Sequence, residues 1–190
     1  MESFIVSFSA VAIAEIGDRT QLLALMLAAR YRRPWLVLSA VLCATLSNHL
    51  IAGLIGVHLG RFLTPVRLDA AVGISMILMA LWTLIPDKLK EDSAPQRSSA
   101  AWVAAFITLF VAEIGDKTQL ATLALAAAYS NLAAVVAGTT SGMLLANVPA
   151  VFLGQAFATR LPLRAIRLSA AAVFVVLGIV FLVRSLSAAR

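Results

Sequence analysis

The feature that most constrains the fold of this chain is a nine-residue segment that occurs twice. Residues 14–22 read AEIGDRTQL and residues 112–120 read AEIGDKTQL, so eight positions are identical and the ninth keeps its positive charge. Further matches follow in the same order: Tyr31 with Tyr129, Thr45 with Thr139, Ser47 with Ser141, and Gly60 with Gly154. Self-similarity of this length and order predicts a chain built from two related halves.

Both copies of the segment lie inside long apolar runs. Hydrophobic residues make up 62% of the 190 residues and charged residues only 13%, and the mean hydropathy is +0.97. A soluble domain carries about a quarter charged residues, so we expect lipid to be the solvent. Six apolar segments of roughly 20 residues account for the chain. They cover residues 4–29, 35–59, 70–85, 102–128, 132–157 and 168–183.

Each half of the chain contains three predicted spans, which is an odd number. The two halves must therefore enter the membrane in opposite orientations. We predict an all-α membrane protein with six transmembrane helices, arranged as two inverted three-helix repeats over residues 1–86 and 101–190 and joined by a polar linker, residues 87–100. In transporters of this plan the binding site lies near the bilayer midplane, between the repeats.

The predicted loops differ in positive charge. The loops after the first, third and fifth spans carry nine Lys and Arg residues, whereas the other loops and the termini carry four. Cytoplasmic loops are enriched in these residues, so we expect the linker 87–100 in the cytoplasm and both termini outside. The first apolar run lacks a basic N-terminal region and contains charges, which argues against a cleaved signal peptide.

Four of the nine acidic residues lie inside predicted spans, where a carboxylate is costly and by default functional. Within each motif, the Glu and the Asp are three residues apart and are expected on one helix face. The glycine between them permits close helix approach or local unwinding. The predicted metal ligands are Glu15, Asp18, Gln21, Glu113, Asp116 and Gln119. Auxiliary residues along the pathway are Arg19, Thr20, Ser47, Asn48, Lys117, Thr118, Ser141 and Asn147.

An oxygen-rich pocket without sulfur or imidazole suits a hard divalent cation such as Ca²⁺, Mn²⁺ or Mg²⁺. If both motifs converge, four carboxylates, Arg19 and Lys117 sum to a formal charge of minus two, which one divalent ion neutralises. An empty cluster should take up protons, because like charges and desolvation both disfavour ionisation. Cation and protons then compete for one site, which predicts cation:proton antiport by alternating access.

With these two motifs the chain resembles the GDT-one family, whose signature is Glu-x-Gly-Asp-(Lys/Arg)-(Thr/Ser). The signature stands here at residues 15–20 and 113–118, and the resemblance covers essentially the whole chain. It implies a fold like that of the cation/Ca²⁺ exchangers and exchange of Mn²⁺ or Ca²⁺ for protons. The motif acids of the family carry over to these residues: Glu15, Asp18, Glu113 and Asp116.

The resemblance also implies a cellular role. Eukaryotic relatives resemble Golgi Ca²⁺/Mn²⁺:proton antiporters, and bacterial relatives resemble manganese exporters. This short chain is most similar to a bacterial member, so we expect a multi-pass protein of the plasma (inner) membrane that exports Mn²⁺, or Ca²⁺ in second place. The cation is then cargo, and we expect no resident cofactor.

Other interpretations of the sequence stay open. In each motif the Glu precedes the basic residue, Arg19 or Lys117, by four positions, and the two could form a structural ion pair. An intramembrane enzyme acting on a lipid phosphate would need Ser, Arg or His groups to hold and attack the phosphate. An organic-solute exporter could share the helical plan, although four carboxylates suit a cation better. The expected partners are a divalent ion, protons and the bilayer, with no nucleic acid; a homo-oligomer is left open.

Overall fold

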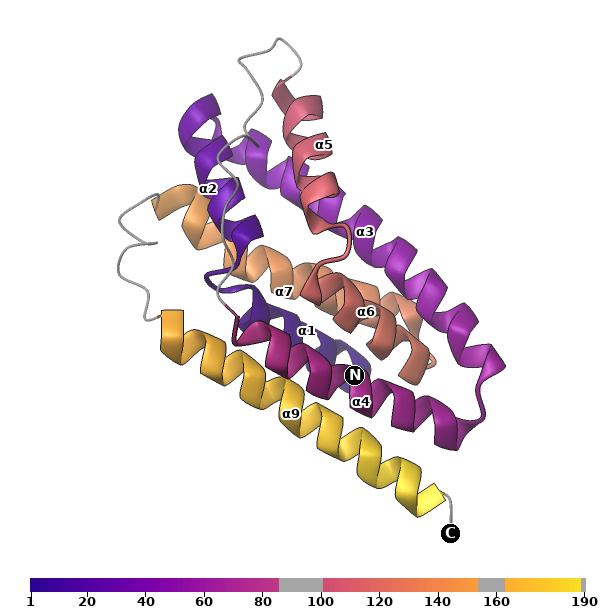
Figure 1. Ribbon diagram of the computed structural model, residues 1–190. Helices are drawn as coiled ribbons and strands as arrows, with labels where there is room; N and C mark the ends of the chain where they lie inside the picture. Colours follow the sequence, from indigo (N-terminus) through magenta and orange to yellow (C-terminus); the bar gives the residue numbers. More distant parts are fainter. Residues whose placement is uncertain (86–100, 154–162, 189–190) are drawn as a thin grey trace.

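The computed structural model describes residues 1–85, 101–153 and 163–188 of the chain, and all of its regular elements there are helices (Figure 1). In chain order these are α1 (Glu2–Glu15), α2 (Arg19–Tyr31), α3 (Pro34–Phe62), α4 (Pro65–Thr83), α5 (Ala101–Glu113), α6 (Lys117–Ala128), α7 (Leu132–Leu153) and α9 (Leu163–Ala188). The predicted linker, residues 87–100, lies outside the described residues.

The two segments that carry the motifs are broken. Each was predicted as a single span whose glycine permits local unwinding, and the unwinding occurs: residues 16–18 separate α1 from α2, and residues 114–116 separate α5 from α6. The cause lies in the glycines, because Gly17 and Gly115 have φ angles of 79° and 73°. Glycine adopts this left-handed region without steric cost, whereas other residues rarely do. Each motif therefore unwinds at its centre.

Four of the described helices are long and apolar enough to cross a membrane, namely α3, α4, α7 and α9. Pro34 and Pro65 begin α3 and α4 at the position where a missing backbone N–H costs nothing. α4 begins before its predicted segment, and α9 extends beyond its own at both ends. Arg67 and Arg184, expected in loops, are therefore helical. The four half-helices α1, α2, α5 and α6 have 12 to 14 residues each, too few to span a bilayer alone.

Helices from the two halves of the chain interleave. α4 packs along α9, α1 along α7, and α3 along α6 (Figure 1). The buried apolar side chains form two cores. One joins α1, α4, α6 and α9, and the other joins α2, α3 and α5. Each break separates a helix of one core from a helix of the other, so the motif residues lie where the two cores meet.

The packing is tighter at the end of the molecule that holds α1 and α6. There α4 packs on α6 and α9 packs on α1, whereas the corresponding pairs at the other end, α9 with α2 and α4 with α5, hardly touch within the described residues. Glycines permit the closest contacts: a Cβ at Gly56 of α3 would overlap the Leu123 carbonyl of α6, and one at Gly142 of α7 would lie 2.6 Å from the Phe8 oxygen of α1. The α1/α6 end is thus closed by contact between backbones.

Candidate metal centre

The two breaks have almost the same local geometry. Asp18 and Asp116 are the N-caps of α2 and α6, with ψ angles of 165° and 163°. The backbone N–H of Gly17 donates to Oε1 of Gln21 at 2.7 Å, and the equivalent bond in the second motif measures 2.6 Å. Each motif Glu ends one half-helix and each motif Asp begins the next. The expectation that the two share one helix face is therefore wrong; they flank a break instead.

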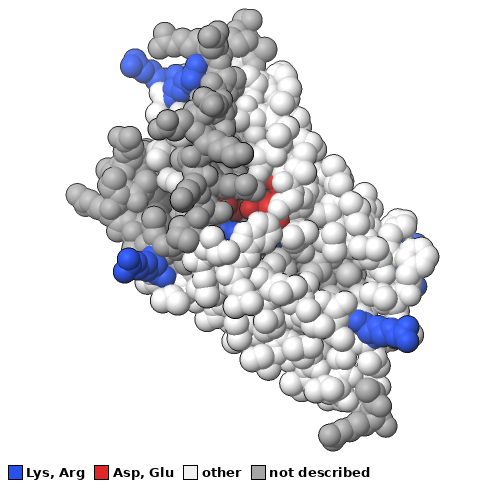
Figure 2. Space-filling view, viewed as in Figure 1, with Lys and Arg blue, Asp and Glu red and all other residues white. Residues whose placement is uncertain are grey.

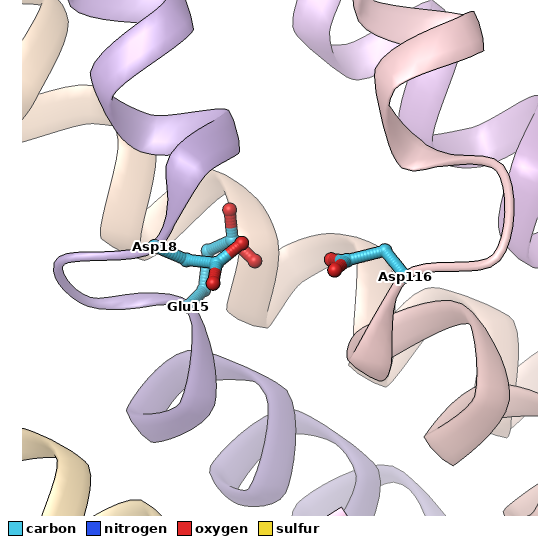
Figure 3. Close-up of side chains that lie close together, drawn as sticks. All are labelled: Glu15, Asp18 and Asp116. Carbon is cyan, nitrogen blue, oxygen red and sulfur yellow. The ribbon is translucent and has the colours of Figure 1, made fainter. Parts of the chain in front are cut away.

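Three of the four predicted acids meet between the motifs. Glu15, Asp18 and Asp116 each offer a carboxylate oxygen within 4.8 Å of the others (Figure 3). Their exposed fractions are 0%, 5% and 1%. Cations of the size of Ca²⁺ or Mg²⁺ bind oxygens at about 2.0–2.6 Å, so oxygens at this spacing can share one ion. The two halves of the chain together build this carboxylate cluster.

The fourth predicted acid, Glu113, is held by α3 instead. Thr45 donates its hydroxyl to Oε1 of Glu113 at 2.8 Å, and the Asn48 amide donates to Oε2 at 3.1 Å. Glu15, in contrast, does not contact α3 in this way; the amide side chain of Asn147 of α7 lies beside its carboxylate, just outside ideal hydrogen-bond geometry. Sequence reasoning did not single out Thr45 as a site residue, although its match with Thr139 in the repeat was a signal that could have done so.

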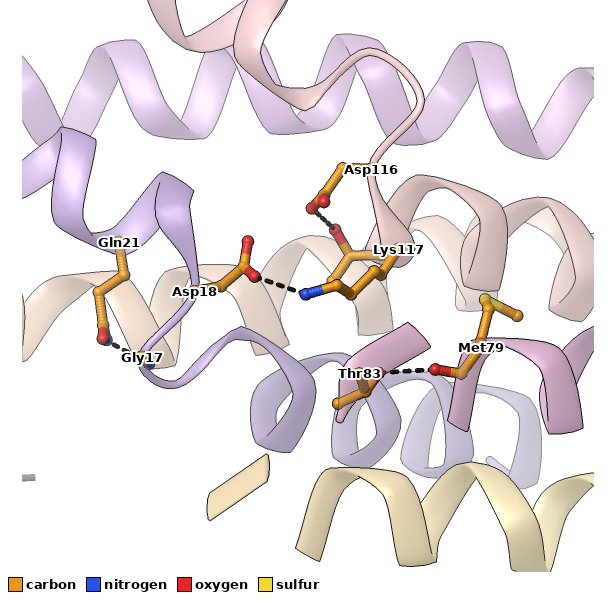
Figure 4. A network of polar contacts seen from close by, with 8 residues as sticks. Gly17, Asp18, Gln21, Met79, Thr83, Asp116 and Lys117 are labelled. Carbon is orange, nitrogen blue, oxygen red and sulfur yellow. Dashed lines mark hydrogen bonds and ion pairs between the residues drawn. The ribbon is translucent and has the colours of Figure 1, made fainter. Parts of the chain in front are cut away.

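A cation from the second motif reaches into the cluster. Lys117 is buried, and its Nζ lies 3.1 Å from Oδ1 of Asp18 in the first motif (Figure 4). This ion pair links the two halves rather than two residues of one motif. With three carboxylates and one ammonium group, the formal charge of the described cluster is minus two. The side chain of Arg19, also predicted here, lies outside the described residues.

The two predicted glutamine ligands stabilise the backbone at the helix breaks. While their Oε1 atoms accept from the glycine N–H groups, Nε2 of Gln21 donates to the Ala146 carbonyl at 2.6 Å and Nε2 of Gln119 donates to Oδ1 of Asn48 at 3.3 Å. In this conformation their polar atoms bond to the backbone at the break and to α3 or α7. The two glutamines therefore position the carboxylates and are not themselves part of the carboxylate cluster.

Two of the predicted auxiliary threonines lie beside the cluster. Thr118 donates to Oδ2 of Asp116 at 3.2 Å. Thr20, the equivalent residue of the first motif, is fully buried, and its hydroxyl has no hydrogen-bond partner among the described residues. A buried hydroxyl without a partner is costly, so the Thr20 oxygen is available to a ligand in the same region.

The predicted auxiliary residues of α3 and α7 divide into two groups. Asn48 lies at the site, bonded to Glu113, and Asn147 is fully buried with no hydrogen-bond partner for Oδ1 among the described residues. Ser47 instead donates to the Cys43 carbonyl within its own helix. Ser141 is half-buried in α7. The structure therefore brings the asparagines, and not these serines, to the motifs.

The face of the molecule in Figure 2 shows the charge pattern expected of such a site. Carboxylate atoms, with basic atoms next to them, are visible near the centre of a broad uncharged surface, and the other basic side chains in view lie towards the ends. Charge inside an apolar belt is expensive and marks a functional site by default.

Comparisons with known proteins identify relatives of this chain. The family model described as "Divalent cation/proton antiporter GDT1" matches residues 3–91 and 101–189. A Vibrio cholerae protein named "Putative manganese exporter" is 47% identical over 181 residues, covering 94% of this chain and 90% of that protein. The "Divalent cation/proton antiporter GDT1" of Saccharomyces cerevisiae is 24% identical over 236 residues, covering 96% and 84%. No solved structure gives a significant match.

The family model matches nearly the whole chain in two stretches, one on each half, and each stretch contains one of the broken helices that supply the carboxylates. These relatives are named as transporters and not as enzymes. The chain is therefore a transporter that belongs to the GDT1 family of divalent cation/proton antiporters.

Proposed function

We propose that this protein exports a divalent cation, Mn²⁺ in the first place and Ca²⁺ in the second, in exchange for protons. The observation that carries the proposal is the buried carboxylate cluster of Glu15, Asp18 and Asp116, drawn from both motifs. Carboxylate oxygens are ligands that both Mn²⁺ and Ca²⁺ accept. The 47% identical relative named as a manganese exporter supports Mn²⁺ as the cargo.

The charge of the cluster supports exchange. Three carboxylates and Lys117 leave a formal charge of minus two, which either one divalent cation or two protons would neutralise. A buried site must stay near neutrality, because an uncompensated charge in an apolar medium is very costly. Cation and protons are therefore alternative occupants of one site, and the cation is transported cargo rather than a resident cofactor.

The broken helices complete the proposed topology. Four helices can cross the membrane by themselves, and the pairs α1–α2 and α5–α6 would each cross as one broken span. Six crossings put the two halves in opposite orientations, as inverted repeats. Broken helices at the midplane are the usual ion sites of such transporters, because their ends present free backbone groups and dipoles. From the excess of Lys and Arg in the loops on the linker side, we propose that the linker lies in the cytoplasm and that both termini lie outside an inner membrane.

Unequal packing supports alternating access. The α1/α6 end is closed by backbone contacts, whereas α2 and α5 at the other end make few contacts with α4 and α9. The α2/α5 end is the end that leads to the linker. On this basis we propose that the α1/α6 end is the closed gate of this conformation, and that the site gains access to that side only in the alternative conformation.

The two alternative functions fit the described site less well than cation:proton antiport does. A lipid-phosphate enzyme does not fit a family of antiporters, and the described site presents carboxylates where phosphate would need cations. An organic-solute exporter would need apolar or aromatic groups beside the polar ones. The described site instead has three carboxylates, one amine and threonine hydroxyls.

Flux in proteoliposomes tests the proposal. With an inward Mn²⁺ gradient we expect Mn²⁺ uptake coupled to proton release, and acceleration of uptake by an opposing proton gradient. Asp116→Asn should abolish both fluxes together, while Ser187→Ala, an exposed site at the end of α9, should leave them unchanged. Mn²⁺ flux that neither responds to a proton gradient nor moves protons would contradict antiport. Uptake of amino acids in competition with Mn²⁺ would favour the organic-solute alternative.

A further inference from the structure

Two buried polar side chains outside the carboxylate cluster have no role in the proposed exchange. His49 of α3 and Thr140 of α7 are 1% and 5% exposed. Nδ1 of His49 and Oγ1 of Thr140 have no hydrogen-bond partner among the described residues. A buried polar atom without a partner is costly, and where a native protein keeps one it calls for an explanation. The two side chains are therefore candidates for contact with a ligand.

The helices that carry these side chains, α3 and α7, pack against each other in opposite directions. Gly53 lies in the later half of α3, and a Cβ there would be 3.2 Å from Cγ2 of Val136, near the start of α7. Val151, near the end of α7, belongs to the same buried core as Val37 and Ala40, near the start of α3. The course of the two helices in Figure 1 agrees. Steps back along α3 and forward along α7 therefore both lead away from the α1/α6 end.

This packing places His49 and Thr140 opposite each other. His49 precedes Gly53 by four residues. Thr140 follows Val136 by the same number. Residues four apart lie on one helix face, so the two side chains face each other across the α3/α7 interface, one turn inward from the Gly53 contact. Asn147, beside the carboxylate cluster, lies seven residues beyond Thr140, or roughly 10 Å at 1.5 Å per residue. This polar pair thus lies between the Gly53 contact and the cluster.

A surface pocket of about 260 Å³ lies on the other side of the Gly53 contact, at the α1/α6 end. Ala126 of α6 belongs to both features, because it lines the pocket and its Cβ lies 3.7 Å from the position of a Cβ at Gly53. Arg61, which is exposed, and Tyr129 also line the pocket. The Tyr129 hydroxyl donates to Glu2, so a base and an acid flank the pocket. Its charge therefore does not exclude a cation.

We propose that the cation passes between the carboxylate cluster and the α1/α6 side by a route along the interface of α3 with α6 and α7. On this route His49 and Thr140 contact the passing cation through a ring nitrogen and a hydroxyl oxygen. The contact of Gly53 with Leu132 and Val136 is the gate, which is closed in the present conformation. The surface pocket is the outer end of the route. The inference rests on the proposed function and adds a path and two cation-contacting residues to it.

The chemistry of these residues suits passage of an ion rather than its retention. An ion on a transport route must bind strongly enough to enter and weakly enough to leave, and apolar constrictions close such routes by excluding water. His49 and Thr140 offer no carboxylate, so they hold a cation more weakly than the cluster does. Gly53, Leu132 and Val136 have no polar side-chain atom. Movement of the two α7 side chains away from Gly53 would connect the pocket with the polar pair.

The reaction rates of single cysteines test the route. Val136→Cys is placed in a Cys43→Ser background, which has no other cysteine. A charged thiol reagent that does not cross membranes is added to proteoliposomes, on the side that the α1/α6 end faces. Val135→Cys is the matched control, because Val135 is the adjacent residue but packs in the core of α1, α4, α6 and α9. Ser130→Cys, exposed at the pocket, identifies the molecules that present this end to the reagent.

The expected result is a difference between the two valine positions. Val136→Cys should react at least about tenfold faster than Val135→Cys, with or without Mn²⁺, because the gate opens in the alternative conformation. Equal rates in the two variants, or no reaction of Val136→Cys, overturn the route even if the wild type exchanges Mn²⁺ for protons. Reaction of Val136→Cys without such exchange in the wild type contradicts only the proposed function.

Two variants of His49 test the polar pair. Phenylalanine keeps a ring of similar size without a lone pair, whereas glutamine keeps an oxygen that can contact a cation. In proteoliposomes His49→Phe should slow Mn²⁺ exchange by about tenfold, and His49→Gln should keep more than about half of the wild-type rate. Equilibrium Mn²⁺ binding should stay within about twofold of the wild type in both, because the carboxylate cluster is unchanged. Equal exchange rates in the two variants, or loss of Mn²⁺ binding in His49→Phe, overturn the role of His49.

Discussion

The first and second helix breaks match in their backbone and differ in their surroundings. Both have a glycine at φ near 75° and an aspartate N-cap, and both have a glutamine that accepts from the glycine N–H. Yet Gly115 is exposed and Glu113 is bonded to Thr45 and Asn48 of α3, whereas Gly17 is half-buried and Glu15 lies beside Asn147 of α7. The motif sequence therefore determines the backbone geometry of each break. The contacts with α3 and α7 determine the surroundings of each carboxylate.

The largest expected effect comes from the two glutamates themselves. Glu15→Gln removes a ligand from the cluster, whereas Glu113→Gln changes a side chain that α3 holds outside it. In detergent solution we expect Glu15→Gln to weaken equilibrium Mn²⁺ binding by about 100-fold, or about 2.7 kcal/mol, and Glu113→Gln by less than about tenfold. Calorimetric titration measures both.

This pair also separates binding from transport. Both variants should lose exchange in proteoliposomes, because each removes a buried carboxylate next to the breaks, although only Glu15→Gln loses most of its binding. Equal losses of binding in the two variants would mean that the breaks are equivalent in the resting protein, contrary to the structure.

A smaller effect is expected where the breaks differ in helix packing. Gly56 of α3 lies against the α6 backbone. Gly56→Ala should force α3 from α6 and lower the free energy of unfolding by about 3 kcal/mol, as measured by chemical denaturation. Gly53→Ala is the control, because its closest neighbour is the movable end of Leu132, and it should cost less than about 1 kcal/mol. Equal costs would show that α3 and α6 are not locked by backbone contact.

The second break offers a test of backbone strain alone. A Cβ at Gly115 would have no neighbour within 4 Å, so only the φ of 73° resists a side chain. Gly115→Ala should lower the free energy of unfolding by about 1–2 kcal/mol. Gly115→Asn should lower it less, because asparagine tolerates the left-handed region. Unfolding curves of the two variants with the same midpoint as the wild type would mean that the break relaxes without glycine.

The smallest effect concerns the matched tyrosines at the ends of α2 and α6. The Tyr129 hydroxyl donates to Glu2 at 3.4 Å, while the Tyr31 hydroxyl has no hydrogen-bond partner among the described residues. Burial, followed by the charge of Glu2, raises the pKa of Tyr129 above 10. The raised value means that its contribution to stability is present below pH 10 and is lost as the pH rises through the folded pKa.

Thermal unfolding against pH measures this contribution. Tyr129→Phe should change stability by at most about 0.5 kcal/mol at neutral pH and should flatten the loss of stability above pH 10. Tyr31→Phe should leave both unchanged. A larger effect at Tyr31 than at Tyr129 would contradict the hydrogen bond from Tyr129 to Glu2 as the difference between the two tyrosines.

Much of this arrangement was predictable from the sequence. The repeat and the intramembrane acids identified the motifs, and the apolar runs located α3, α4, α7 and α9 to within a few residues. The glycine in each motif was expected to permit unwinding. That the helices break at these glycines was not predictable, because hydropathy does not register a break of three residues inside an apolar run and tertiary contacts decide the φ angle of a glycine.

The division of labour between Glu15 and Glu113 was not predictable. The donors to Glu113 lie 68 and 65 residues away in the chain, and their approach depends on how far α5 stands along α3. The sequence places Glu15 and Glu113 at equivalent positions of the repeat, whereas tertiary packing determines which donors each glutamate meets. The glutamine roles were missed for a related reason, since an amide can serve either a metal or a backbone N–H.

The most direct test of the carboxylate cluster as the cation site is anomalous diffraction at the manganese absorption edge, from crystals grown with Mn²⁺. In the conformation described here we expect one peak between the two breaks, about 2.0–2.6 Å from carboxylate oxygens of Glu15, Asp18 and Asp116, with Glu113 still bonded to Thr45. A peak outside these three residues, or none at a Mn²⁺ concentration that saturates binding in solution, would contradict the account.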